Sequence, residues 1–355
     1  MRQTLFHIPD TLFGLPVFGW GLGLAVLLAI VLLSHAWQYF KHRKITDVGH
    51  SVAMLAIGSV LLVFILPYIA EEDGIPIRGY GFCLLVAVLF AFFLVRHLAI
   101  KQGISVEKVY SLCIWTVVFG IIGARIFFVT EYWEDIRRVD EAGRFLPMES
   151  VLNVLNFTQG GLVVFGSIIG GILTALIFMR LNGMPILRTF DIMAPAVALG
   201  IAIGRIGCLL NGCCFGSVSN TSWAITFPLD SPAHHYQVVH GLVLEPLVVL
   251  PVHPTQIYSS FLAFLLCGVL LFLGRTEFYR QREGLVLATF MMLYSLGRFF
   301  IEIVRTDEAP FFGTGMTISQ NVSIAFGLAG IALFVYLCNR KSTGDDTVNP
   351  RNGGR

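Results

Sequence analysis

The sequence predicts an all-α protein, a polytopic bundle of about nine transmembrane helices. Hydrophobic residues make up 56% of its 355 positions, and charged residues only 13%. Soluble domains carry about a quarter charged residues, so this composition lies outside that class. Several apolar windows reach about 20 residues, the length that a helix needs to cross a bilayer. The net charge of +2, without any basic run, gives no indication of nucleic-acid binding.

The first apolar run begins at Leu15, and no small-residue cleavage site follows it. We therefore expect an uncleaved span there, not a signal peptide. The nine expected spans cover residues 15–36, 48–70, 79–100, 109–130, 160–180, 190–211, 254–274, 283–304 and 318–338.

The placement of lysine and arginine predicts the orientation of these spans. With the N-terminus outside, the inner loops and the C-terminal tail hold 15 of the 24 basic residues, the outer segments hold 6, and 3 lie within spans. Cytoplasmic loops show such an excess, which indicates a cytoplasmic C-terminus. We expect residues 1–70 to be an additional N-terminal membrane region, 71–340 the main membrane domain, and 341–355 a disordered cytoplasmic tail.

Three of the spans carry an arginine at the same expected depth. Arg125, Arg205 and Arg298 lie five or six residues from the outer ends of the fourth, sixth and eighth spans. That is roughly 8 to 9 Å below the outer interface. A single arginine at this depth is explained by snorkelling or by a structural ion pair. Three at one level favour a phosphate-bearing lipid, because a guanidinium matches a phosphate bidentately.

The eighth span adds a polar stripe to this picture. Tyr294, Arg298, Glu302 and Arg305 fall within an arc of about 80° on a helix. Such a stripe on an apolar helix faces the bundle interior or a wet cavity, and Glu302 is placed to orient an arginine. A self-contained Arg-Glu-Arg network that only locks helix packing is the alternative.

Glycines and a histidine gather at the same outer edge. Gly160 and Gly161 open the fifth span and could offer backbone amides to an anion. Small residues in membranes also serve helix packing, which remains the alternative. His253 opens the seventh span in the motif HPTQIY, where it could equally be a capped loop histidine.

From about Ile75 to Asn339 the chain resembles the prolipoprotein diacylglyceryl transferase family. The resemblance rests on several motifs in the same order: RGYG at 78–81, GAR at 123–125, GGLVVFG at 160–166, APAVALGIAIGRIG at 194–207, HPTQIY at 253–258 and YSLGRFFIEIVRTDE at 294–308. It covers roughly three quarters of the chain. Residues 1–70 would then be an addition to the family's usual seven helices.

The resemblance implies an activity, its partners and its location. Such enzymes move the diacylglyceryl group of phosphatidylglycerol to the lipobox cysteine of a prolipoprotein, in the bacterial inner membrane. A thioether forms and glycerol phosphate leaves, with no cofactor and no metal. A phosphate leaving group suits the arginines, since such a displacement depends on positioning and on leaving-group stabilisation.

The resemblance also assigns residues. The implied catalytic residues are Arg205, Arg298, Tyr80 and Tyr294. The implied phosphatidylglycerol site comprises Arg205, Arg298, Arg125, Asn211, Gly216, Glu302, Arg305, Gly160, Gly161 and His253.

The sequence departs from the family pattern at four positions. Phe165 stands where many members have histidine, Cys208 where asparagine is usual, Cys213 where glutamate is usual, and Ser259 where an acidic residue is usual. The chain could therefore be a catalytically altered or inactive member that binds anionic phospholipid.

Without the histidine, the group that deprotonates the thiol stays open. The proton could pass to lipid, to water or to Tyr80 or Tyr294. A histidine of the outer loops could also substitute; the candidates are His234, His235, His240 and His253.

The adjacent Cys213 and Cys214 raise the question of a vicinal disulfide, a metal site or a lipid-accepting thiol. Neighbouring cysteines are poorly placed for an unstrained disulfide, and no further ligands stand at zinc spacing. We expect them to be small packing residues at a helix end.

Overall fold

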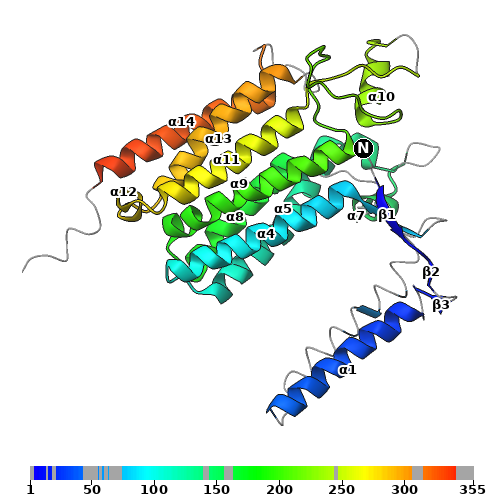
Figure 1. Cartoon of the computed structure of the whole chain (residues 1–355), viewed down its shortest axis with the longest axis horizontal. Coiled ribbons are helices and arrows are strands. Elements are labelled where there is room, and N and C mark those ends of the chain that lie inside the picture. The colour runs from blue at the N-terminus through cyan, green and yellow to red at the C-terminus, as the bar shows by residue number, and fades with distance from the viewer. Residues whose placement is uncertain are drawn as a thin grey trace, which may run out of the picture. The chain divides into compact units, whose positions relative to one another are not determined.

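Seven long helices dominate the structure, a computed structural model that describes residues 4–12, 15–17, 21–42, 55, 58–59, 63, 74–138, 144–155, 163–243, 247–305 and 315–340 (Figure 1). These seven are long and apolar enough to cross a membrane: α4 (Gly79–Lys101), α5 (Val106–Glu131), α8 (Val164–Leu181), α9 (Ile186–Asn211), α11 (Thr255–Leu273), α13 (Leu285–Val304) and α14 (Ile318–Asn339). Each begins and ends within four residues of an expected span.

The two N-terminal spans of the prediction are not confirmed. Helix α1 (Leu22–His42) starts seven residues later than expected, because Leu15–Pro16 form strand β3, which pairs with β2 (Thr11–Leu12). The apolar stretch of α1 among the described residues, Leu22–Leu33, is shorter than a span. The second expected span, 48–70, lies almost wholly outside the described residues.

Short elements fill the segments between the long helices. Strand β1 (Thr4–Ile8) pairs antiparallel with β4 (Ile75–Arg78), which leads directly into α4. The two long segments expected outside the membrane, 131–159 and 212–253, contain the short helices α6 (Trp133–Ile136), α7 (Pro147–Leu155) and α10 (Pro232–Val239). Helix α12 (Glu277–Arg280) connects α11 to α13.

The chain divides into two compact units, which do not follow the expected boundaries. The first comprises residues 1–85, 206–213 and 225–251, and the second residues 86–205, 214–224 and 252–355. The expected division at residues 70 and 340 stays a prediction.

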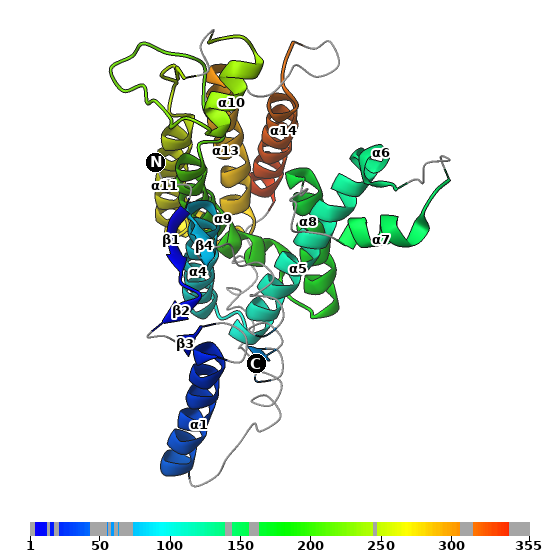
Figure 2. The ribbon, with the colours of Figure 1, turned by 90° about the vertical axis from the view of Figure 1, so that its right-hand side faces the viewer.

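Within the second unit, α5 and α8 pack closely through glycine (Figure 2). A Cβ atom on Gly123 would lie only 2.4 Å from the carbonyl oxygen of Gly166, and one on Gly166 only 2.3 Å from the carbonyl oxygen of Gly123. The backbones therefore touch where any side chain would separate them. Small residues support helix pairs in membranes in this way, because they let dispersion contacts form along the backbone.

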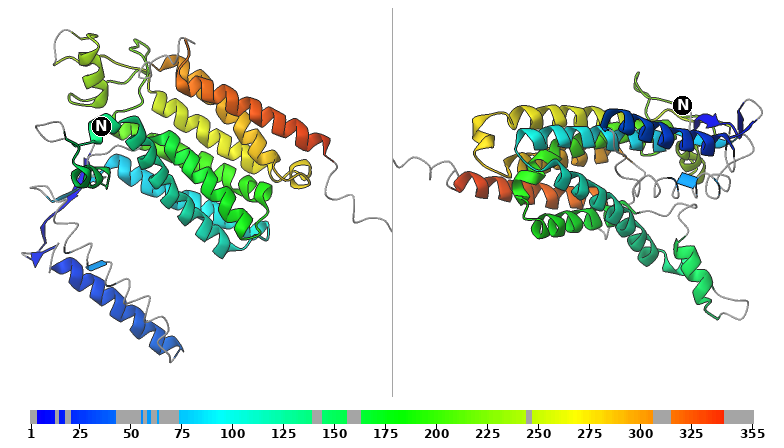
Figure 3. Two further views of the ribbon diagram at one scale, coloured as in Figure 1. Left: turned by 180° about the vertical axis from the view of Figure 1, so that it is seen from behind. Right: turned by 90° about the horizontal axis from the view of Figure 1, so that it is seen from below.

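The same unit has a buried apolar core between α9, α11 and α13. Its buried members are Ala194, Ala198, Leu266, Cys267, Leu270, Val286 and Phe290. Helix α13 also contacts α14 along its length, and the three helices α11, α13 and α14 lie side by side in Figure 3. This packing fixes the helices that carry Arg205 and Arg298.

Candidate functional site

The three arginines lie at matching positions on their helices. Arg125, Arg205 and Arg298 each stand six residues before the last residue of α5, α9 and α13, respectively. At about 1.5 Å per residue this is roughly 9 Å from the helix end. Their surroundings nevertheless differ.

Glu302 organises the charged cluster on α13. Its Oε2 lies 2.6 Å from Nη1 of Arg298, one turn earlier, and 3.6 Å from Nη1 of Arg305. Glu302 is only 2% exposed, and the side chains of Arg298 and Arg305 are 13% and 6% exposed. Three of the four residues of the predicted stripe thus form a buried network in which one carboxylate lies between two guanidinium groups. The predicted role of the stripe in binding lipid stays a prediction.

Helix α14 completes this network. Arg298 donates from Nη2 to Ser319 Oγ at 2.9 Å, and Thr317 Oγ1 donates to Glu302 Oε1 at 3.3 Å. Thr317 is also the N-cap of α14, held by a capping box with Gln320. The start of α14 is thus tied to the orientation of Glu302.

Arg205 on α9 lies close enough to Arg298 for their like charges to repel each other. The other groups that act on the charge of Arg298 are Arg305, Glu302 and Tyr294. Within the described part of the chain, these three guanidinium groups and the Glu302 carboxylate sum to two positive charges. In a weakly screened environment that excess favours an anion beside the cluster. Tyr294, one turn before Arg298, stacks on Phe290 with ring centroids 5.5 Å apart.

Arg125 is engaged by a different segment. It is 7% exposed and donates from Nε to the carbonyl of Val154 at 2.8 Å and from Nη2 to that of Asn153 at 2.9 Å. Its guanidinium also lies over the Phe128 ring, 5.2 Å from the centroid. These contacts dock α7 on α5.

Gly216 connects the end of α13 to the segment before α11. Its N–H donates to the carbonyl of His253 at 2.9 Å, and Gly216 forms an antiparallel bridge with Arg305. A Cβ atom here would lie 2.8 Å from His253 Cβ and 3.0 Å from the carbonyl oxygen of Val304. Only glycine allows these three segments to approach so closely.

His253 belongs to a polar chain at this edge. Its Nδ1 lies 3.2 Å from the hydroxyl of Tyr258, which accepts a hydrogen bond of 2.8 Å from the indole of Trp223. Tyr258 therefore helps to orient the ring of His253, and the tautomer of His253 decides which of the two groups donates.

Two other predicted site residues, Tyr80 and Asn211, lie in the first unit. Tyr80 packs against Gly207, where a Cβ atom would be 3.3 Å from the tyrosine ring. Asn211 lines a cavity of about 220 Å³ with Leu210, Gly212, Phe227, Asp230 and Ser231 among the other lining residues. Gly160 and Gly161 lie outside the described residues.

The loop histidines other than His253 lie on or beside α10. His234 is buried and accepts at Nδ1 from the backbone N–H of Asp230, His235 is exposed, and His240 stacks on Tyr236. Their proposed use as a base stays a prediction.

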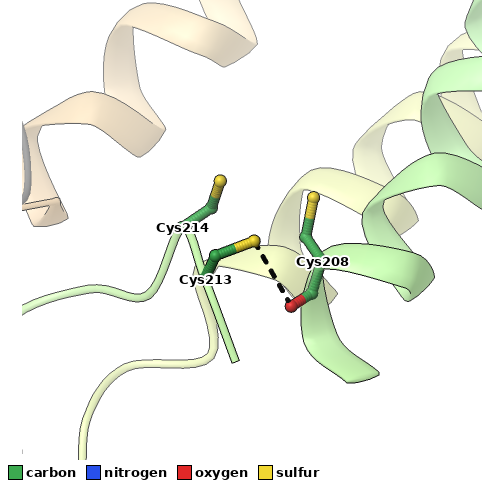
Figure 4. A group of neighbouring side chains, drawn as sticks. All are labelled: Cys208, Cys213 and Cys214. Carbon is green, nitrogen blue, oxygen red and sulfur yellow. Dashed lines mark hydrogen bonds between the residues drawn. The ribbon is translucent and has the colours of Figure 1, made fainter. Parts of the chain in front are cut away.

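The cysteines near the end of α9 are drawn in Figure 4. The Sγ of Cys213 points back to the carbonyl oxygen of Cys208, at 3.8 Å, and Cys214 follows with a positive φ of 60°. All seven cysteines lie in the described part of the chain, and none of them is in a disulfide there. Their expected role as small packing residues stays a prediction.

Comparison with known proteins decides the family. The model of the prolipoprotein diacylglyceryl transferase family matches residues 67–336. The chain belongs to this family. The resemblance seen in the motifs is thereby confirmed.

Several curated members of the family are similar to this chain. A phosphatidylglycerol–prolipoprotein diacylglyceryl transferase of Clostridium perfringens is 32% identical over 279 residues, which cover 78% of this chain and 98% of the relative. One from Synechococcus elongatus is 32% identical and covers 81% and 93%. One from Rhodopirellula baltica is 35% identical, and the match covers 69% of this chain but only 50% of that longer relative.

In this transferase family member, sequence reasoning missed the partners on α14. Thr317 and Ser319 hold Glu302 and Arg298, and their signal was the capping-box spacing of Thr317 and Gln320. The contact between Trp223 and Tyr258 was also missed. No local pattern links them, because 35 residues separate the two.

Proposed function

We propose that this protein transfers the diacylglyceryl group of phosphatidylglycerol to the lipobox cysteine of prolipoproteins. The observation that carries the proposal is the buried Arg298–Glu302–Arg305 network, with the charge of Arg205 acting on Arg298, in a chain of a diacylglyceryl transferase family. The names of the relatives favour transfer over the non-catalytic lipid-binding alternative.

The chemistry is a displacement at carbon. The sulfur of the lipobox cysteine bonds to the terminal glycerol carbon of the diacylglyceryl group, after its proton has passed to a base. The bond between that carbon and the phosphate oxygen breaks, and the electron pair leaves with glycerol phosphate. Arginines beside the phosphate stabilise the charge that accumulates on the leaving group.

The proposed roles follow the positions of the residues. Arg205 and Arg298 hold the phosphate, and Glu302 aims Arg298 while Arg305 balances the carboxylate. Gly216 holds His253 and Arg305 together at the edge of the cluster. Arg125 donates hydrogen bonds to the carbonyls of Asn153 and Val154, and it supports the site by docking α7 on α5.

The remaining site assignments rest on the family motifs. Tyr80 and Tyr294 are proposed as catalytic tyrosines. The lipid site is completed by Asn211, Gly160, Gly161 and His253, and no metal or cofactor is proposed.

We propose the bacterial inner membrane as the location, with nine spans, the N-terminus outside and the C-terminus in the cytoplasm. Seven described helices that are both long and apolar enough to cross a membrane, and the excess of basic residues in the expected inner loops, support this topology. Residues 1–70 would supply the two additional spans, 71–340 the transferase domain, and 341–355 a cytoplasmic tail.

A reconstituted transfer assay tests the function. The purified protein is mixed with phosphatidylglycerol and a lipobox peptide, and glycerol phosphate release and the mass of the peptide are measured. We expect release to equal thioether formation, and an Arg298→Gln variant to lose both. Lipid binding without release, beside an active relative as control, would contradict the proposal.

A further inference from the structure

Asp191 of α9 forms an unusual cap on another helix. Its carboxylate is buried, with 8% of the residue exposed, and accepts hydrogen bonds from the backbone N–H groups of Gly284 at 2.6 Å and Leu287 at 2.8 Å. Gly284 is the N-cap residue of α13 and has no side chain to satisfy these amides. The carboxylate of Asp191 on α9 therefore caps the N-terminus of α13.

This contact fixes α13 along its axis. The first amides of a helix lack partners within it, and a carboxylate there is favoured by the helix dipole. Hydrogen bonds to a charged acceptor are short and strong, and burial protects them from competing water. The two bonds hold the N-terminus of α13 at the level of Asp191.

Each arginine lies the same number of residues beyond the cap on its own helix. Arg205 stands 14 residues after Asp191 on α9, and Arg298 stands 14 residues after Gly284 on α13. Both helices run from the cap toward their arginines, because Asp191 and Gly284 lie near the first residues of α9 and α13. In a regular helix fourteen residues rise about 21 Å and return to within about 40° of the starting face. In α9 this stretch includes Pro195, so its core packing must also hold the level.

The packing between these two ends keeps the register. Ala194 and Ala198 of α9 lie in one buried cluster with Val286 and Phe290 of α13. The cap and this core are thus two successive contacts between the helices.

We propose that Asp191 is a positioning residue that sets Arg205 and Arg298 at one height for an anionic lipid headgroup. The inference rests on the proposed lipid site, and it assigns Asp191 no contact with substrate. A guanidinium must lie within about half an ångström of its productive position. A small displacement of α13 along its axis therefore lowers the affinity for phosphate.

The test compares Asp191→Asn with a control variant that loses another hydrogen bond at the same end of α13. Tyr279→Phe removes the hydrogen bond of 3.0 Å between Tyr279 and Thr289, which does not involve α9. Binding of short-chain phosphatidylglycerol is measured by calorimetry on the full-length protein in detergent, with the thermal midpoint recorded alongside. We expect Asp191→Asn to weaken binding about tenfold and Tyr279→Phe less than about twofold.

A double-mutant cycle separates positioning from general stability. Residues that act through one another give non-additive effects. In an Arg298→Lys background, we expect Asp191→Asn to cost less than about twofold in affinity. An equal penalty in both backgrounds, or unchanged affinity in folded Asp191→Asn, would overturn the proposal.

Asp191→Glu replaces Asp191→Asn in the binding measurement if the asparagine variant does not fold. It retains the charge and lengthens the side chain by one methylene, so it should fold and bind with intermediate affinity. Binding at wild-type strength in that variant, with the thermal midpoint lowered, would also contradict a positioning role. Glycerol phosphate release by the wild type is scored separately, so failure of the transferase activity is distinguished from failure of this inference.

Discussion

Arg298 and Glu302 are joined by a salt bridge of 2.6 Å, one turn apart on α13, and the carboxylate is fully buried. Because Arg305 shares the same oxygen and Thr317 donates to the other, Glu302 determines where both guanidinium groups point. Removing one partner of a buried ion pair leaves the other charge uncompensated, which costs about 3–5 kcal/mol. The stability and the binding capacity of the cluster should therefore change together.

Replacement of this carboxylate is the first prediction. Glu302→Gln should lower the free energy of unfolding by about 3 kcal/mol and abolish transfer, because two guanidinium groups lose their shared partner. Unfolding in detergent and the transfer assay measure the two effects. Glu134→Gln is the control, since it breaks an exposed pair with Arg137 that should be worth about 1 kcal/mol or less. Equal losses of unfolding free energy and activity in the two variants would show that the ion pairs of Glu302 contribute no more than an exposed surface pair.

Close approach at Gly216 gives the second prediction. Gly216→Ala would place a methyl group 2.8 Å from His253 Cβ and 3.0 Å from the Val304 carbonyl oxygen. The three segments must then separate, so activity should fall at least about tenfold, with a stability loss of about 1–3 kcal/mol. Gly268→Ala on α11 is the matched control, because its Cβ would meet nothing within 4 Å. Wild-type activity in Gly216→Ala would mean that this junction does not shape the site.

A third prediction concerns Arg125, whose contacts differ from those of the other arginines. Arg125→Lys cannot reach the carbonyls of Asn153 and Val154 with two donors in a fixed fork. Hydrogen exchange should therefore rise in residues 147–155. Lipid affinity should fall less than in Arg205→Lys. An unchanged exchange pattern at α7, with affinity lost as strongly as in Arg205→Lys, would place Arg125 directly on the phosphate.

The long helices of this fold could be predicted from sequence because burial in a membrane requires about 20 consecutive apolar residues. The same rule gave a wrong start for the first span. The residues before Leu22 are apolar as well, but Leu15 and Pro16 pair with β2 instead of extending α1.

The site was predictable only where helical periodicity decides it. Glu302 lies three and four residues from Arg305 and Arg298, and such neighbours share a face. The contacts of Arg125 with the carbonyls of residues 153 and 154, and of Asp191 with Gly284, join segments 28 to 93 residues apart. No local pattern encodes such pairings, because they depend on how whole helices pack.

A lipid site at these arginines is tested most directly by the amount of phosphatidylglycerol that the protein binds. Lipid binding is measured by native mass spectrometry and calorimetry for wild type, Arg205→Gln and Arg298→Gln. Arg282→Gln serves as control, since Arg282 lies over the Phe278 ring and belongs to the α12–α13 connection. We expect either cluster variant to weaken binding at least about tenfold, the effect of one lost charge-assisted contact, while the control stays within about twofold. Equal affinity in all four proteins would contradict a phosphate site at these arginines.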